Sequence, residues 1–515
     1  MILTKGLIRS AQNFSDQLAV VDGKVAHTYH AFSDRVSQLQ QALKQEGIEK
    51  GDRVAILMFN DFRYLELFYA VTAIGAIAVP LNYRLTAAEI VEQLRDSSPK
   101  ALFFHQEFAP IVAGMVMRVL SVRLFVRVEG ERNEEETGFM IDYEEFLRPH
   151  SPQPLAYGEV IEDDVAGIFY TGGTTGRSKG VMLTHRNLVS NAYHAALAFR
   201  FDRYTRYVHA APMFHLADGA CTFALTLVGG THQILRTFQP DMFLDWVEQA
   251  QPTTTLLVPT MVNRLINHPD VEKRNCSSLR QLLYGGSAMP VEVLKKAREV
   301  WPHLSFMQAY GMSEAAPVVT VLPPEDYQVE ERLASCGQVV TGVEAKIIDD
   351  HGGEVGVREV GELIVRGPNV MKGYWNRHEE TDLVLKGGWY HTGDMVYRDE
   401  QHYLYVVDRK KDMIVTGGEN VYSIEVEQVL YQHPAVLEAA VIGVPDPVWV
   451  EAVKALVVKR ADQEVDTQTL LDFCRERLAG FKVPKSLKFV EELPKNAAGK
   501  ILKRTLREQY SQPAD

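Results

Sequence analysis

The segment from Tyr170 to Gly180 concentrates residue types that bind anions. It reads Tyr-Thr-Gly-Gly-Thr-Thr-Gly-Arg-Ser-Lys-Gly and follows the apolar run 165–170. Glycines let the backbone approach an anion closely, and successive amides can form an anion-binding nest. Three threonine hydroxyls add donors, and Arg177 and Lys179 add positive charge. A plain hairpin turn needs none of these groups, so the segment predicts a phosphate-binding loop.

This loop differs from the two common nucleotide-binding fingerprints. A Walker A loop needs a second glycine where this chain has Arg177 or Ser178, depending on which glycine is taken as the first. The sequence contains no Gly-x-Gly, so the dinucleotide fingerprint is absent as well. The candidate phosphate ligands of the loop are Thr171, Gly172, Gly173, Thr174, Thr175, Gly176 and Lys179.

In this loop and in further motifs the chain resembles the adenylate-forming superfamily, and within it the bacterial fatty-acid–CoA ligases of the acyl-CoA synthetase branch. The motifs follow the family order over nearly the whole chain, which makes the match far more specific than one loop. Relative to the common family loop, Gly172 replaces Ser and Ser178 replaces Pro, which removes one hydroxyl and some rigidity. The other motifs lie at residues 211–218, 284–290, 308–314, 388–394, 408–421 and 494–504.

The resemblance implies that two glycine-containing motifs surround the adenine ring. Tyr310 would stack on the ring, and Ser313, where Thr is more usual, would keep a hydroxyl for the α-phosphate. Glu314 would hold Mg²⁺, a hard cation that prefers carboxylate and phosphate oxygens. Without the family context, Glu314 is simply a surface carboxylate. The remaining implied adenine neighbours are Gly285, Gly286, Ser287 and Gly311.

The resemblance also assigns the ribose, the hinge and the path of coenzyme A. Asp394 would accept hydrogen bonds from the ribose hydroxyls, with Arg409 beside it, although alone it reads as an Asx turn. The charged run 408–412 would normally be a solvated loop, but here it places the family hinge at Lys411. The implied CoA-binding residues are Gly417, Gly418 and Glu419.

Catalysis is implied for Lys500, which would also contact ATP, together with Glu314, His215 and Thr171. Without the family context, Lys500 is a lysine in a flexible segment and His215 is a histidine of the core. By resemblance, His215 is the aromatic gate between the acyl pocket and the CoA tunnel. Two departures from the family pattern are Ser423, where Pro is usual, and Val450, where Gly is usual.

The predicted acyl pocket contains no basic residue, so we expect the acid to carry an apolar tail. A medium- or long-chain fatty acid is the first choice, and an aryl acid is the second, because a pocket closed by Phe214 and Met312 can hold a ring. The pocket candidates are Phe214, Leu216, Ala217, Met261, Gly285, Ala309 and Met312.

Helix-type and strand-type patterns alternate over the first 160 residues. Helical spacing occurs at 32–45, 64–74 and 86–95, and apolar strand patterns occur at 53–58, 76–80 and 101–104. Such alternation predicts α/β layers with mainly parallel strands, and it resumes over 187–320. Short strand patterns punctuated by glycine follow at 345–348, 362–365 and 403–407.

We therefore expect an α/β fold with a large N-terminal adenylate-forming domain, residues 1–408. It would comprise two layered α/β subdomains and a small β-barrel-like subdomain at about 330–408. Residues 409–411 would form the hinge. Residues 412–515 would form a small mobile α+β domain that carries Lys500.

Composition limits the partners and the compartment. The net charge is −13, from 54 basic and 67 acidic residues, which argues against nucleic acid as a general partner. Cys221, Cys276, Cys336 and Cys474 lack metal-type spacing and read as free thiols in a reducing compartment. The apolar run 67–81 is short for a membrane span, and no signal-peptide pattern opens the sequence. We expect a soluble cytoplasmic protein, and the sequence is compatible with peripheral membrane contact and with a homodimer.

The expected function is that of an AMP-forming acyl-CoA synthetase with Mg²⁺ as cofactor and ATP and CoA as co-substrates. Three alternatives remain: an aryl-acid CoA ligase, a stand-alone adenylation enzyme that serves a separate carrier protein, and a non-catalytic nucleotide-binding protein. The last is disfavoured because five charged site residues occur together, namely Lys179, Glu314, Asp394, Arg409 and Lys500.

Overall fold

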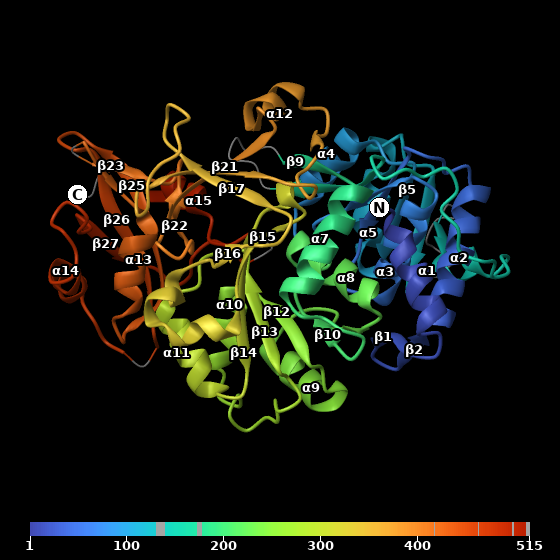
Figure 1. Cartoon of the computed structure of the whole chain (residues 1–515), viewed down its shortest axis with the longest axis horizontal. Helices are drawn as coiled ribbons and strands as arrows, with labels where there is room; N and C mark the ends of the chain where they lie inside the picture. The colour runs from blue at the N-terminus through green and yellow to red at the C-terminus, as the bar shows by residue number, and fades with distance from the viewer. Residues whose placement is uncertain (130–139, 172–177, 417, 462, 497–498, 511–515) are drawn as a thin grey trace.

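The computed structural model describes residues 1–129, 140–171, 178–416, 418–461, 463–496 and 499–510. Its strands form four sheets, two large and two small (Figure 1). The alternation expected from the sequence is confirmed in the N-terminal segment, where the apolar run 67–81 forms the end of one helix and the following strand. The elements concerned are α2 (Tyr29–Gln45), β3 (Arg53–Leu57), α3 (Phe62–Ala73), β4 (Ile77–Pro80), α4 (Ala87–Ser97) and β5 (Ala101–His105).

The first large sheet has eight strands in the order β19-β9-β8-β4-β3-β5-β6-β7. From β8 to β7 the strands are parallel, as expected for α/β layers, and β9 and β19 close one edge in antiparallel pairing. The bounds not yet given are β6 (Leu124–Val128), β7 (Met140–Asp142), β8 (Val165–Thr171), β9 (Lys179–Thr184), β19 (Gly373–Tyr374), α5 (Ala109–Met115) and α6 (Tyr143–Leu147).

The second large sheet has nine strands in the order β16-β15-β14-β13-β12-β10-β11-β1-β2. Its central six strands, from β14 to β1, are parallel. The strand bounds are β1 (Leu18–Asp22), β2 (Val25–Thr28), β10 (Arg206–His209), β11 (Thr231–Ile234), β12 (Thr254–Leu257), β13 (Gln281–Gly285), β14 (Ser305–Gly311), β15 (Val318–Leu322) and β16 (Gln338–Val339). The helices of this part are α1 (Leu3–Asn13), α7 (His185–Ala198), α8 (Leu216–Val228), α9 (Pro240–Ala250), α10 (Pro259–Ile266) and α11 (Val291–Val300).

The glycine-punctuated region forms an antiparallel sheet of five strands. It is tied to both large sheets, because β16 pairs with β15 and β19 pairs with β9. The sequence did not indicate these two pairings. The elements are β17 (Glu344–Ile348), β18 (Gly361–Arg366), α12 (His378–Val384), β20 (Leu385–Lys386), β21 (Trp389–Arg398) and β22 (Leu404–Arg409).

The last part of the chain forms its own five-stranded sheet with its own buried core. Asp408, at the end of the preceding sheet, accepts hydrogen bonds from the amide and the hydroxyl of Ser423, at 2.6 and 2.7 Å. A proline at 423 would lack that amide, so the departure from the family pattern contributes a contact. The elements are β23 (Ile414–Thr416), β24 (Glu419–Val421), α13 (Ser423–Tyr431), β25 (Val436–Asp446), β26 (Val450–Lys459), α14 (Thr467–Arg475), β27 (Ser486–Phe489) and α15 (Lys503–Tyr510).

The C-terminal part rests on helices α10 and α11 (Figure 1). The amide of Val291 donates to Gln428 at 3.2 Å, and Arg460 donates to Asn267 at 2.8 Å. A Cβ at Gly499 would lie 2.5 Å from the hydroxyl oxygen of Thr260, so the backbone of the C-terminal loop approaches α10 closely. These contacts hold the loop that carries Lys500 against the N-terminal part.

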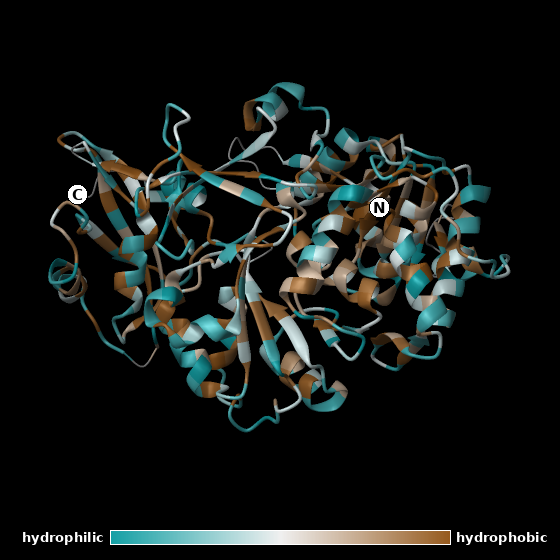
Figure 2. Cartoon of the chain, viewed as in Figure 1, coloured by the Kyte–Doolittle hydropathy of each residue, from teal (hydrophilic) through white to brown (hydrophobic). Residues whose placement is uncertain are grey.

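The helices turn their apolar faces toward the core. Figure 2 shows hydrophilic and hydrophobic residues alternating along α11, whose Val293, Leu294 and Ala297 are buried. All four cysteines are buried and unpaired, as expected. Within the described residues, every helix is too short or too polar to cross a membrane.

The close approach of β13 to β14 makes Gly285 a stability determinant. A Cβ at this position would lie 2.2 Å from the carbonyl oxygen of Ala309, so Gly285→Ala forces the two strands apart. We expect the free energy of unfolding to fall by about 1–3 kcal/mol, with a lower thermal midpoint. Gly480→Ala is the control, because nothing lies within 4 Å of its added Cβ. Equal thermal midpoints for the two variants would contradict the prediction.

Candidate functional site

A buried carboxylate joins the carboxyl end of the parallel strand β14 to the antiparallel pair β21–β22. Asp394 of β21 is 3% exposed and lies opposite Arg409 of β22 in the strand register. Its Oδ2 accepts a hydrogen bond of 2.6 Å from the hydroxyl of Tyr310 in β14, and its Oδ1 lies 3.0 Å from Nε of Arg409. A carboxylate has about four acceptor sites, so lone pairs remain for two further hydroxyls. The sequence expectation that Arg409 accompanies Asp394 agrees with this geometry.

The ring of Tyr310 is fixed by the same bond. Burial and the adjacent Asp394 carboxylate raise the pKa of Tyr310 well above its usual value, so the phenol stays a donor. Beside this ring, β13 ends at Gly285, and Gly286 continues with φ at +80°. At Gly311 a Cβ would lie 1.8 Å from the carbonyl oxygen of Pro317. Bare backbone beside a fixed aromatic ring provides a surface on which a flat heterocycle can lie.

Glu314 and Lys179 share one neighbour that the sequence did not reveal. Glu314 follows β14, in a 3₁₀ turn over Ser313–Ala315, and its Oε1 accepts a hydrogen bond of 2.9 Å from the hydroxyl of Tyr374. The Nζ of Lys179 lies 5.1 Å from the Tyr374 ring centre and 2.5 Å from Oε2 of Glu380. Tyr374 and Glu380 carried no motif of their own, so only the pairing of β19 with β9 identifies them.

The residues around Glu314 fit a magnesium ion that arrives with a nucleotide. Burial raises the pKa of Glu314, so a nearby cation would favour its charged form. Mg²⁺ in phosphate-transfer sites is held by one or two carboxylates, by waters and by substrate phosphate oxygens. Glu314 would supply one such ligand, just after the carboxyl end of β14.

Lys500 is held by two hydrogen bonds with Asn496. Its amide donates to Asn496 Oδ1 at 2.9 Å, and its carbonyl accepts from the Asn496 amide at 2.8 Å. Burial, followed by the positive charge of Arg409, lowers the pKa of Lys500 to about 8. Burial, followed by the charge of Lys500, lowers the pKa of His215 to about 4. Lys500 is therefore close enough to the Asp394–Arg409 pair and to His215 for their charges to interact.

His215 is held neutral by its place at the start of α8. Its Nδ1 accepts a hydrogen bond of 3.2 Å from the amide of Ala217, so Nε2 carries the ring proton. With a pKa of about 4 the ring is uncharged at neutral pH. A neutral ring beside Lys500 is compatible with a gate that flanks an apolar pocket.

Part of the predicted site lies outside the described residues, namely Gly172, Gly173, Thr174, Thr175, Gly176 and Gly417. The strands that flank the phosphate loop are described, and Thr171 pairs directly with Lys179 across β8 and β9. Gly418 and Glu419 are exposed, at the β24 edge of the C-terminal sheet. In Figure 1, β23 lies at the outer end of the C-terminal part, away from the N-terminal part.

The predicted acyl-pocket residues line three neighbouring core clusters. Phe214 and Leu216 are buried in the largest cluster, and Met312 packs against it. Ala217 and Ala309 pack against the cluster between α8 and the nine-stranded sheet. Met261 is buried in the cluster under α10. Ser287 lies half-buried after Gly286.

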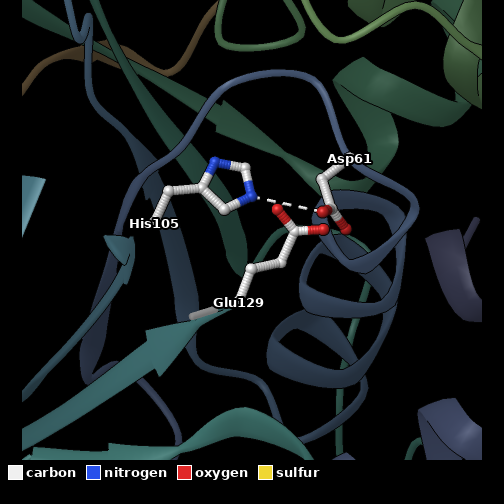
Figure 3. A group of neighbouring side chains, drawn as sticks. All are labelled: Asp61, His105 and Glu129. Atoms are coloured by element: carbon white, nitrogen blue, oxygen red, sulfur yellow. Dashed lines mark hydrogen bonds and ion pairs between the residues drawn. The ribbon is translucent and has the colours of Figure 1, made fainter. Parts of the chain in front are cut away.

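A second cluster of polar residues lies at Asp61, His105 and Glu129 (Figure 3). Nδ1 of His105 accepts from the amide of Phe59 at 3.0 Å, so Nε2 carries the proton and donates to Asp61 at 3.2 Å. A metal would need that nitrogen unprotonated, and guanidinium groups already pair with both carboxylates. These are Arg63 with Asp61 at 3.1 Å and Arg236 with Glu129 at 2.7 Å. The cluster is therefore a charge network that packs β5 and β6 against α3.

Comparisons with known proteins support the sequence resemblance. The family model described as AMP-binding enzyme matches residues 7–375, and its C-terminal domain model matches residues 425–500. A feruloyl-CoA synthase from an Amycolatopsis species is 40% identical over 98% of both chains. A long-chain-fatty-acid–CoA ligase from Bacillus subtilis is 35% identical over 98% of this chain and 94% of its own. The structure of the amide bond synthetase McbA from Marinactinospora thermotolerans aligns with a TM-score of 0.88 at 32% identity, over 99% of this chain and 100% of that one. Because the family model matches most of the chain and the relatives match over its whole length, this chain belongs to the family of AMP-binding enzymes.

Proposed function

We propose that the protein is an AMP-forming acid–CoA ligase. ATP and a carboxylic acid form an acyl-adenylate, and the acyl group then passes to the thiol of CoA. The observation that carries this proposal is that Lys500 of the C-terminal part faces the Asp394–Arg409 pair and His215 of the N-terminal part. A purely nucleotide-binding protein has no need to bring a second domain's lysine into the pocket.

The first half-reaction needs positioning and positive charge more than proton transfer. A carboxylate is a poor acyl donor because its leaving group would be oxide, so its oxygen attacks the α-phosphorus and pyrophosphate leaves. Asp394 binds the ribose and Tyr310 stacks on the adenine. Lys179 leaves its ion pair with Glu380 and binds the phosphates instead. Mg²⁺ on Glu314 would supply further charge on the phosphate oxygens. Lys500 donates to the reacting oxygens, the type of preorganised stabilisation that dominates such steps.

The second half-reaction needs a different surface of the C-terminal part. The CoA thiolate attacks the acyl carbonyl and AMP leaves, which requires a thiol path past His215. Gly418 and Glu419 are exposed rather than packed against the N-terminal part, which supports a rotation about Lys411 that withdraws Lys500 and brings in residues 417–419. Around this hinge, Lys410 donates its amide to Gly393 at 2.9 Å, and Asp412 donates to Arg409 at 2.8 Å.

The acid has an apolar tail, which is an aromatic ring or an alkyl chain, because relatives of both kinds match this chain. The feruloyl-CoA synthase acts on an aryl acid and the fatty-acid ligases on alkyl chains, according to their names. The amide bond synthetase raises a second candidate function, in which an amine replaces CoA as the acceptor. Release of AMP that depends on CoA, measured against a panel of amines, separates these two functions.

The first prediction separates the two half-reactions. Lys500→Ala should slow adenylation, measured as ATP–pyrophosphate exchange, by about 10²–10³, because one transition-state donor is lost. Thioester formation from supplied acyl-adenylate should be largely preserved. Lys488→Ala is the matched control, because Lys488 is an exposed lysine in β27 of the C-terminal sheet. An equal loss of both half-reactions would contradict a role for Lys500 in one conformation only.

The second prediction concerns pH. Because the pKa of Lys500 is about 8 in the free protein, its cation is present below pH 8 and is lost above it. The kcat/KM for ATP in the exchange assay, which reports the free enzyme, should therefore fall as pH rises through 8. In Lys500→Arg this fall should disappear, since arginine stays charged. A wild-type profile that is flat from pH 7 to 10 would exclude the assignment.

The third prediction tests the hinge. Lys411→Pro fixes φ at 411 and restricts the preceding residue, so it should trap one arrangement and impair CoA transfer more than pyrophosphate exchange. Lys411→Ala, which leaves the backbone free, is the control. Both rates should be compared for both variants in the same preparation. If the proline and alanine variants behave alike, the rotation occurs at another residue.

A further inference from the structure

A chain of buried polar side chains runs between α8 and strands β10 and β11. The hydroxyl of Tyr207 donates to Asp218 Oδ1 at 3.0 Å, and Nδ1 of His209 lies 2.6 Å from Oδ2 of the same carboxylate. All three side chains are 0% exposed. Tyr207 and His209 also meet edge to face, with ring centres 4.8 Å apart. The position of the Tyr207 ring is thus fixed by both a hydrogen bond and a ring contact.

The chain continues to the next strand and back to the helix. Nε2 of His209 lies 2.9 Å from Nδ1 of His232, and the two rings are stacked at 5.2 Å. Nε2 of His232 lies 2.9 Å from the hydroxyl of Thr226, two helical turns after Asp218. Each of these groups is at most 2% exposed. Because an unpaired polar group in such a place is costly, the network resists rearrangement.

The network shares a buried cluster with residues of the predicted acyl pocket. Ala217 and Ala309, two of the pocket candidates, pack against the cluster that contains Tyr207 and Cys221. Cys221 follows Ala217 by one helical turn, about 6 Å along α8, and its thiol interacts with the Tyr207 hydroxyl. The Tyr207 ring is therefore packed in the same cluster as the two alanines between which an acyl group would enter.

We propose that Tyr207 forms the floor of the acyl pocket and that the Asp218–His209–His232 chain locks it, so that the acid is a compact aryl acid rather than a long alkyl acid. This rests on the proposed function of acid activation. A long alkyl tail would have to displace the ring and leave Oδ1 of Asp218 without the Tyr207 donor, beside apolar carbon, which is unfavourable. A planar ring needs less depth and finds aromatic partners such as Phe214 and Tyr83, whose centres are 5.3 Å apart.

The test compares acids in one assay, CoA-dependent AMP release, for the wild type and two variants. The panel contains benzoate, a hydroxycinnamate, hexanoate, dodecanoate and hexadecanoate. The wild type should use the aryl acids with a kcat/KM at least about tenfold above that for hexadecanoate. Tyr207→Ala should raise the ratio of dodecanoate to aryl acid by about tenfold or more, because the floor is removed. Tyr207→Phe keeps the ring and should leave that ratio within about threefold of wild type.

The outcomes distinguish this inference from the proposed function. A wild type that prefers hexadecanoate overturns the inference while acid activation stands. A Tyr207→Ala enzyme whose ratio matches that of Tyr207→Phe also overturns it. If no acid supports AMP release, the proposed function itself fails. Should Tyr207→Ala prove unfolded by its thermal midpoint, Tyr207→Leu replaces it with a smaller loss of volume and the same expected direction.

Discussion

The site depends on one buried carboxylate, that of Asp394. It joins β14 to the distant β21–β22 pair, and it binds the Tyr310 hydroxyl on one oxygen and Arg409 on the other. A carboxylate in this position is tolerated only because it is paired and hydrogen-bonded. The pair therefore fixes the end of β14 relative to β21 and β22. Since Arg409 is the first residue of the predicted hinge 409–411, the same contact also fixes where the C-terminal part begins.

Two of the three predicted nucleotide-binding cations are paired with carboxylates, and the third, Lys500, has a lowered pKa. The chain as a whole carries a net charge of −13, yet three cations, Lys179, Arg409 and Lys500, are predicted to contact the nucleotide. Arg409 is neutralised by Asp394 and Lys179 by Glu380. Burial and the nearby charge of Arg409 lower the pKa of Lys500 to about 8. A polyanionic nucleotide relieves that repulsion, so the charge arrangement favours binding of ATP.

Two buried polar networks hold the helices α8 and α3 in place. The Tyr207–Asp218–His209 chain fixes α8, whose first turn is capped by His215. The His105–Asp61 pair fixes the start of α3, where Asp61 also caps the helix. Both networks are satisfied internally, so they add rigidity next to the acyl gate without using its reactive groups.

The sequence alone determined the alternation of helices and strands, because this depends on local periodicity. It predicted the phosphate loop and the charged site residues from short motifs and their resemblance to a family. It assigned Asp394, Arg409, Tyr310 and Lys500 to one site, and the structure brings these four together. Tyr374 and Glu380 could not be found that way, since their roles arise from the pairing of β19 with β9. The buried polar network beneath α8 could not be predicted either, because the sequence does not indicate which residue a histidine or aspartate in an apolar run contacts. Only tertiary packing, which sets the distance between residues remote in sequence, decided that Tyr207 closes the space behind Ala217.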